Sequence, residues 1–238
     1  MSDALVRVHQ LVKHYQALRP LRLQSLALQP ADIVAIKGLD AQAAEMLVGL
    51  LTGAVLPDEG EIRLFGKSTR DVTDSDAWLQ MLDRVGIVTD RAVLIAQFTI
   101  EQNLAMPFTL QVDPPSVETR QRVAEVASAV GLQDQKLDAR VADSSPLTVA
   151  RVRLARALAL NPSVLLAEHP SASLPRDDVT TFAADIARVA TTQTLAVLAL
   201  TADDAFARAL GGTVLTHEPS TGALRKHGLW QRIFTNRQ

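Results

Sequence analysis

The segment Ile33-Val34-Ala35-Ile36-Lys37-Gly38, followed by a helix-like stretch from about Ala43 to Thr52, decides the fold of this chain. Four consecutive apolar residues are typical of a buried parallel strand, because such a strand is covered by other elements on both faces. A strand, a loop and a helix in this order start a βαβ unit. The segment therefore predicts an α/β protein.

Two later segments repeat the signal of a buried parallel strand. Val164 to Ala167 and Leu195 to Leu200 are apolar throughout, and a helix is expected between them from Asp177 to Thr191. Three segments near the N-terminus alternate apolar and polar residues, which is typical of antiparallel strands with one buried face. They span residues 5–9, 21–26 and 61–65. We expect a mainly parallel central sheet flanked by helices, with an N-terminal antiparallel β layer.

The middle of the chain is predicted to be helical. Ser116 can cap a helix that ends at Gly131, and a second helix is expected from about Val149 to Leu160. The second helix carries three arginines, Arg151, Arg153 and Arg156. They form either a patch for an anion or a hydrated helix face, and we favour the hydrated face.

Composition excludes several classes of protein. The 238 residues carry 24 Lys and Arg against 26 Asp and Glu, and the net charge of −2 disfavours a nucleic-acid-binding protein, which is usually basic. The absence of cysteine excludes disulfides and thiolate metal sites. No segment predicts a signal peptide or a membrane span. We expect a cytoplasmic protein that reaches a membrane only through a partner, with no nucleic acid among its partners.

Five features follow one another along the chain, at Tyr15 and at residues 56–62, 86–108, 154–162 and 165–171. In this order they resemble the nucleotide-binding subunit of an ABC transporter. Tyr15 lies where the family has an aromatic residue that stacks on adenine. Four segments resemble the family patterns PDxGxI, GxVFQ with TVxENVxxPL, LARAL with xP, and LLADEPT; they are residues 56–62, 86–108, 154–162 and 165–171. The resemblance covers the chain from about Val6 to Leu224.

The resemblance implies an ABC-type P-loop NTPase-like fold, with a single domain over residues 1–238 and a helical subdomain at about 90–160. It implies ATP hydrolysis coupled to transport, and head-to-tail pairing as a homodimer or as a heterodimer with another ABC ATPase. It also implies a place on the cytoplasmic face of the membrane, bound to a membrane-spanning transporter subunit. The groove near Asp90 to Pro107 is where the family receives a helix of that subunit.

The phosphate loop departs from the family pattern. A working loop has the pattern GxxxxGK[ST], because backbone N–H groups close around the phosphates, the lysine neutralises charge and the hydroxyl holds Mg²⁺. Only Gly38 of this pattern is kept. The positions of the second glycine, the lysine and the two hydroxyl residues hold Ala43, Ala44, Glu45 and Met46.

Acidic residues in this loop argue further against phosphate. Asp40 and Glu45 would each place a carboxylate near a polyphosphate, which costs about 4 kcal/mol for a contact of ~4 Å at an effective dielectric constant of ~20. The N-terminus of a helix returns only about 0.3–1 kcal/mol. We predict that the usual mode of phosphate binding is lost, and that Lys37 or Arg91 pairs with Glu45 or Asp40.

The catalytic positions implied by the resemblance differ as well. Asp90 stands in place of the glutamine that senses Mg²⁺. Glu168 and His169 replace the Mg²⁺-associated aspartate and the general-base glutamate, and Ala202 replaces the switch histidine. Histidine can act as a general base near neutral pH, so a reassigned mechanism stays open. The favoured interpretation is that nothing reacts at His169.

The family's LSGGQ signature corresponds to residues 144–148. Ser145 keeps the serine, but Pro146 and Leu147 replace the two glycines that let the backbone approach the γ-phosphate of the paired subunit. Even a mixed dimer is therefore expected to contain no complete site of the usual kind.

Other candidate sites are weaker. Four histidines lack the spacing of metal ligands and are interpreted as surface or loop residues, so no metal site is expected; they are His14, His169, His217 and His227. The apolar segment from Leu229 to Phe234 either docks onto the domain or marks a partner contact.

These observations lead to three hypotheses. The first is a non-catalytic ABC-type subunit, a pseudo-ATPase with a structural or regulatory role in a membrane transport complex. No cofactor is expected for it, although weak binding of ATP or ADP through Tyr15 and loop amides stays open. The second is an active ATP-hydrolysing transport subunit with atypical motifs. The third is a soluble interaction module unrelated to transport.

Overall fold

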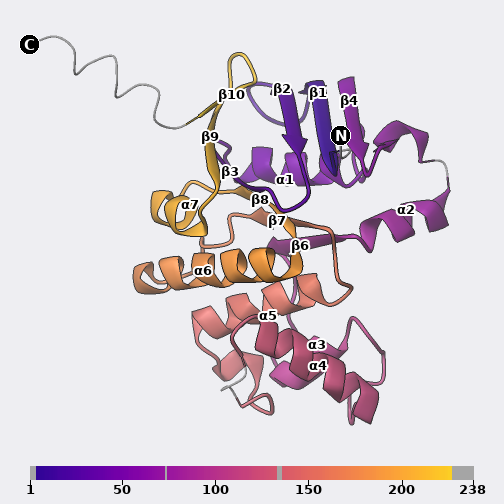
Figure 1. Ribbon diagram of the computed structural model, residues 1–238, viewed down its shortest axis with the longest axis vertical. Helices are drawn as coiled ribbons and strands as arrows, with labels where there is room; N and C mark the ends of the chain where they lie inside the picture. The colour runs from indigo at the N-terminus through magenta and orange to yellow at the C-terminus, as the bar shows by residue number, and fades with distance from the viewer. Residues whose placement is uncertain (1–3, 73, 133–135, 227–238) are drawn as a thin grey trace, which may run out of the picture.

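The computed structural model describes residues 4–72, 74–132 and 136–226 (Figure 1). Its centre is a six-stranded sheet whose strands, in spatial order, are β10 (Ala223–Lys226), β9 (Thr213–Glu218), β3 (Ile33–Lys37), β8 (Ala196–Leu200), β7 (Val164–Glu168) and β6 (Val85–Thr89). All pairings are parallel except that of β9 with β10. The predicted α/β fold with a mainly parallel central sheet is confirmed.

A four-stranded antiparallel sheet covers one face of the central sheet. Its strands, in spatial order, are β2 (Leu21–Leu28), β1 (Val6–Lys13), β4 (Glu59–Leu64) and β5 (Lys67–Ser68). Helix α1 (Ala41–Leu51) shares a core with both sheets: its Leu47 and Leu50 belong to the same buried cluster as Leu23 of β2 and Leu166 of β7. The predicted N-terminal β layer is thus confirmed.

Helices cover the opposite face of the central sheet. Leu165 of β7 shares a second buried cluster with Phe182 of α6 (Arg176–Gln193) and Phe206 of α7 (Asp204–Leu210). Every residue of β7 and β8 is buried. Apart from Glu168 at the end of β7, both strands are apolar because successive side chains point into different cores, one on each side of the sheet.

Three helices pack against one another beside the central sheet and form what we call the helical group. They are α3 (Ile100–Ala105), α4 (Val117–Ala129) and α5 (Pro146–Leu158). Figure 1 shows them on the side of the central sheet away from the antiparallel sheet. Ser116 caps α4 as predicted, since its hydroxyl accepts a hydrogen bond from the Thr119 N–H at 3.1 Å. Helix α2 (Ser75–Leu82) lies near β6, and two 3₁₀ turns span Thr69–Asp71 and Val141–Asp143.

Two helices begin two or three residues earlier than predicted. Helix α1 begins at Ala41 rather than near Ala43, because Asp40 caps it. Helix α5 begins at Pro146 rather than near Val149, because Ser145 caps it and proline suits the first helical position. In the described ranges, none of the helices combines the length and the apolar character needed to cross a membrane.

Candidate functional site

Several predicted site residues lie at the carboxyl ends of the parallel strands. Gly38 directly follows β3, Asp90 follows β6 and His169 follows β7. Ala202 comes two residues after the end of β8. Open α/β sheets bind ligands at this edge, so the topology places these residues where a site is expected.

The counterpart of the phosphate loop is occupied by the first turn of α1. The Asp40 carboxylate accepts a hydrogen bond from the Ala43 N–H at 2.8 Å, and the Asp40 carbonyl accepts one from the Ala44 N–H at 2.9 Å. Ala44 is fully buried. The backbone N–H groups of residues 43 and 44 are therefore used within the chain, and a carboxylate already lies at the positive end of the helix.

Gly38 has a reason to be glycine that is independent of any phosphate. Its φ is +88°, a conformation that favours glycine, and a Cβ added there would lie 2.8 Å from the carbonyl oxygen of His217. The close approach of β3 and β9 thus requires glycine at this position.

Arg91 joins the two acidic positions of the site. Its Nη1 donates to the Glu45 carboxylate on α1, and its Nη2 lies 2.5 Å from Oε2 of Glu168 at the end of β7. The Glu168 side chain is only 7% exposed, whereas those of Arg91 and Glu45 are about half exposed. The predicted pairing of Arg91 with Glu45 is confirmed. Lys37, the other candidate, pairs with Asp204 instead.

Asp90 is held from two sides. Its carboxylate accepts hydrogen bonds from Arg153 of α5 at 2.8 Å and from the Ser173 hydroxyl, in the turn after β7, at 3.1 Å. Arg153 also donates to the Asp90 carbonyl at 3.2 Å.

The prediction of a hydrated arginine face on α5 is wrong. The side chains of Arg151 and Arg153 are each 17% exposed, because each pairs with an aspartate of another element. Arg156 donates to the carbonyl of Val93 at 2.7 Å, and burial lowers the pKa of its guanidinium. These contacts are absent from the local sequence pattern, since each partner lies more than 30 residues away in the chain.

His169 has a positive φ angle and a ring nitrogen without a hydrogen-bond partner among the described residues. Its φ is +41°, and its N–H donates to the Leu200 carbonyl at 2.8 Å. Its Nε2 is buried and has no hydrogen-bond partner among the described residues. Left-handed backbone at a non-glycine residue is strained and occurs often at functional positions.

The residues around Ala202 serve the fold. Ala202 is exposed, whereas Thr201 is buried and its hydroxyl accepts from the Asp203 N–H at 3.0 Å. The Asp203 carboxylate caps α7 by accepting from the N–H groups of Ala205 and Phe206 at 2.8 and 3.1 Å. Thr201 and Asp203 are thus accounted for by helix capping.

Tyr15 lines a cavity of about 220 Å³ next to the start of α1. Gly38, Asp40 and His217 line the same cavity. Burial and, secondarily, the negative charge of Asp40 raise the pKa of the Tyr15 phenol. The cavity lies beside the α1 N-terminus that Asp40 caps.

The interpretation of His217 as a surface or loop residue is wrong. Its side chain is buried in β9, 5% exposed, and its Nε2 lies 2.7 Å from the carbonyl oxygen of Arg22. His227 and the segment from Leu229 to Phe234 lie outside the described residues. Within the described ranges there is no group of three or more His, Cys, Asp or Glu residues that could hold a metal ion.

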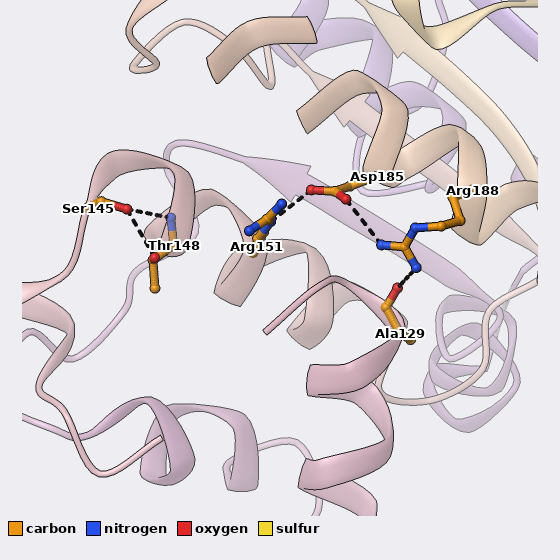
Figure 2. Close-up of polar contacts among 6 residues, drawn as sticks. All are labelled: Ala129, Ser145, Thr148, Arg151, Asp185 and Arg188. Atoms are coloured by element: carbon orange, nitrogen blue, oxygen red, sulfur yellow. Dashed lines mark hydrogen bonds and ion pairs between the residues drawn. The ribbon is translucent and has the colours of Figure 1, made fainter. Parts of the chain in front are cut away.

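Ser145 is the N-cap residue of α5. Its hydroxyl accepts from the Thr148 N–H at 3.2 Å and lies 3.0 Å from the Thr148 hydroxyl (Figure 2). Pro146 occupies the first helical position and has no N–H to offer. The Ser145 hydroxyl is therefore engaged within its own helix.

Comparison with known proteins identifies the family. The family model described as "ABC transporter" matches residues 21–172. The lipoprotein-releasing system ATP-binding protein LolD of Maricaulis maris is 32% identical over 189 residues, which are 77% of this chain and 82% of LolD. The methionine import ATP-binding protein MetN of Brucella abortus is 28% identical over 214 residues, which are 90% of this chain and 57% of MetN.

Solved structures agree in fold. The dimeric ATP-binding cassette MJ0796, in a post-hydrolysis state with ADP and Pi bound, has a TM-score of 0.75 at 21% identity and covers 93% of this chain and 98% of its own. The protein cbiO1 of Clostridium perfringens, part of the ABC transporter complex cbiONQ, has a TM-score of 0.78 at 18% identity, covering 94% and 88%. With the family match over residues 21–172 and a 32% identical relative, this chain belongs to the ABC transporter ATP-binding family.

Proposed function

We propose that this chain is a non-catalytic ABC-type subunit, a pseudo-ATPase with a structural or regulatory role in a membrane transport complex. The observation that supports this most is the Arg91 contact with both Glu45 and Glu168. A guanidinium and two carboxylates of the chain itself take the place that the family uses for the metal and the phosphates.

The residues present do not fit ATP with Mg²⁺ in the usual manner. The lysine and hydroxyl positions hold Ala44, Glu45 and Met46, so neither a cation for the phosphates nor a ligand for Mg²⁺ is supplied by the loop. Asp40 already accepts the N–H of Ala43 that would otherwise face an anion. A phosphate would have to displace a carboxylate and then lie against a second one.

A groove of about 410 Å³ supports a membrane partner. It is bounded by β6, by α5 and by the segments that precede and follow α3. Its lining includes Ile87, Leu94, Met106, Pro107 and Leu160. We propose that a membrane-spanning transporter subunit inserts a helix here, which would hold the chain on the cytoplasmic face. A homodimer, or a heterodimer with another ABC ATPase, is part of the same proposal. So is a single domain with a helical subdomain at about 90–160.

Calorimetric titration of ATP with Mg²⁺ into the purified chain tests the proposal. We expect no saturable heat up to about 1 mM nucleotide, which corresponds to a binding free energy weaker than about −4 kcal/mol. ADP serves as a second probe in the same titration, because it lacks the γ-phosphate and so tests binding through the remaining part of the nucleotide. Saturable binding that requires Mg²⁺ would contradict the proposal.

One observation favours the alternative of an active ATPase with atypical motifs. The buried Nε2 of His169 has no hydrogen-bond partner among the described residues, and histidine is a common general base in enzymes. If His169 acts as the base, phosphate release above background is expected, and it should disappear in His169→Ala. Release that is equal in the parent and the variant eliminates this alternative. The relatives are named as transport proteins, which does not favour a module unrelated to transport.

A further inference from the structure

The chain passes from the central sheet to the helical group through residues 90–93, which we call the junction segment. Three of its four residues are tied by side chains to other elements. Arg91 reaches Glu45 on α1 and Glu168 at the end of β7, and Arg156 of α5 holds the carbonyl of Val93. Asp90 is held by α5 and by the turn after β7, as described above.

Both charged residues of the junction segment, Asp90 and Arg91, form ion pairs. Asp90 and Arg91 are neighbours of opposite charge, and each pairs with a residue of opposite charge on a different element. Asp90 pairs with the helical group, whereas Arg91 pairs with the central sheet and α1. Glu168 is nearly buried, and removal of Arg91, its one ion-pair partner among the described residues, is strongly unfavourable. The two residues together therefore connect the helical group to the rest of the molecule.

A second polar cluster joins the helical group to α6 (Figure 2). The Asp185 carboxylate accepts from Arg151 of α5 at 2.7 Å and from Arg188 at 3.1 Å. Arg188 also donates to the carbonyl of Ala129, the last residue of α4, at 2.9 Å. This cluster uses neither the junction segment nor any position of the nucleotide site, so polar contacts connect the helical group to the rest of the molecule at two separate places, once through the junction segment and once through α6.

We propose that Asp90 and Arg91 form a clasp that holds the helical group in one orientation relative to the central sheet without any bound ligand. The clasp links α1, the end of β7 and the helical group through contacts within one chain. The inference goes beyond the proposed function, since it concerns the conformation of the chain and holds whether or not a nucleotide binds elsewhere on it.

Distance measurement between two spin labels tests the clasp. The chain has no cysteine, so cysteines introduced at Lys67 of β5 and Ala124 of α4, both exposed, can be labelled uniquely. We expect one narrow distance distribution. Addition of ATP with Mg²⁺ at about 1 mM, a concentration at which weak binding would be detected, should leave the distribution unchanged. In Arg91→Ala and in Asp90→Ala the distribution should broaden. A broad distribution in the parent, or one that shifts with ATP, overturns the proposal.

Arg120→Ala is the matched control. Arg120 of α4 pairs with Glu101 of α3 at 3.7 Å, so this ion pair lies entirely within the helical group. Its removal should leave the distance distribution unchanged. Broadening in Arg120→Ala equal to that in Arg91→Ala would overturn the clasp, because any arginine would then have the same effect.

A double variant separates the clasp from a simple loss of folding. Arg91→Ala should lower the melting temperature by several degrees, because Glu168 loses its partner. In Arg91→Ala/Glu168→Gln the melting temperature should rise again, since no charge is left buried, while the distribution stays broad. A distribution that narrows again in the double variant contradicts the clasp. If calorimetry detects nucleotide binding and the parent distribution does not move, the proposed function fails and the clasp stands.

Discussion

Single residues of the site are explained by contacts within the chain. Gly38 allows β3 and β9 to approach, Thr201 and Asp203 shape the start of α7, and Asp40 begins α1. Of these residues Gly38 matches the family's phosphate-loop pattern, yet each of the four has a structural role that needs no nucleotide. A residue that matches a family motif can therefore be required by packing rather than by the chemistry of the site.

Gly38→Ala should destabilise the chain by about 1–3 kcal/mol, because alanine combines an unfavourable positive φ with a clash against the His217 carbonyl oxygen. Gly66→Ala is the control, since Gly66 has a φ of +81° and no atom within 4 Å of an added Cβ. Urea unfolding of both variants isolates the cost of the contact. Equal losses of unfolding free energy would show that the approach of His217 carries no cost.

At the scale of elements, the first turn of α1 supports the proposal that phosphate does not bind here in the usual mode. An open loop presents free N–H groups, whereas here the helix begins at Ala41 and the groups at residues 43 and 44 are bonded to Asp40. Helix α5 shows the same feature, because Ser145 and Pro146 close its N-terminus. Helices α1 and α5 are thus both capped by the side chain that directly precedes them.

Replacement of Asp40 by alanine should lower the free energy of unfolding by about 1 kcal/mol, since the N-cap is lost. Asp40→Asn should change it by only a few tenths of a kcal/mol, because asparagine caps about as well. Urea unfolding followed by circular dichroism measures both. A large loss in Asp40→Asn would mean that the charge of Asp40, rather than its hydrogen bond to Ala43, stabilises α1.

At the scale of the whole molecule, two carboxylates stabilise the fold through hydrogen bonds: Asp58 bonds to a distant segment of the chain, and Glu218 bonds within its own hairpin. Asp58, before β4, accepts from Lys13 Nζ at 2.8 Å and from the His14 N–H at 2.6 Å. Glu218, at the end of β9, accepts from the Thr221 hydroxyl at 2.7 Å and from Arg225 at 3.1 Å. These hydrogen bonds lower the pKa of both carboxyl groups below their ordinary values of 3.8 and 4.5.

Acid should therefore weaken the fold through these two groups. Because their pKa values are lower in the folded chain, their contribution is fully present above the ordinary values, and it is lost as the pH falls through the lowered folded values. Below about pH 4.5 the free energy of unfolding should fall less steeply in Asp58→Asn/Glu218→Gln than in the parent. Urea unfolding at pH values from about 6 to about 3 measures how the free energy of unfolding depends on pH in the parent and in the double variant. Parallel curves would contradict the assignment.

Much of the fold was predictable from the sequence, because strands and helices follow from local patterns. The apolar runs of β3, β7 and β8 and the alternation of β1, β2 and β4 identified both sheets. Helix starts were predicted less well, since the side chains of Asp40 and Ser145 extended α1 and α5 by two or three residues. Capping depends on one hydrogen bond, which a pattern of hydrophobicity does not contain.

The sequence by itself determined the family, the layered α/β architecture and the residue types at each site position, since these depend on order along the chain. Only the tertiary structure decided which charges meet. Arg91 lies 46 residues from Glu45 and 77 from Glu168, and Arg153 lies 63 from Asp90. The physical reason is that an ion pair depends on distance in space, and the packing of the strands and helices sets that distance.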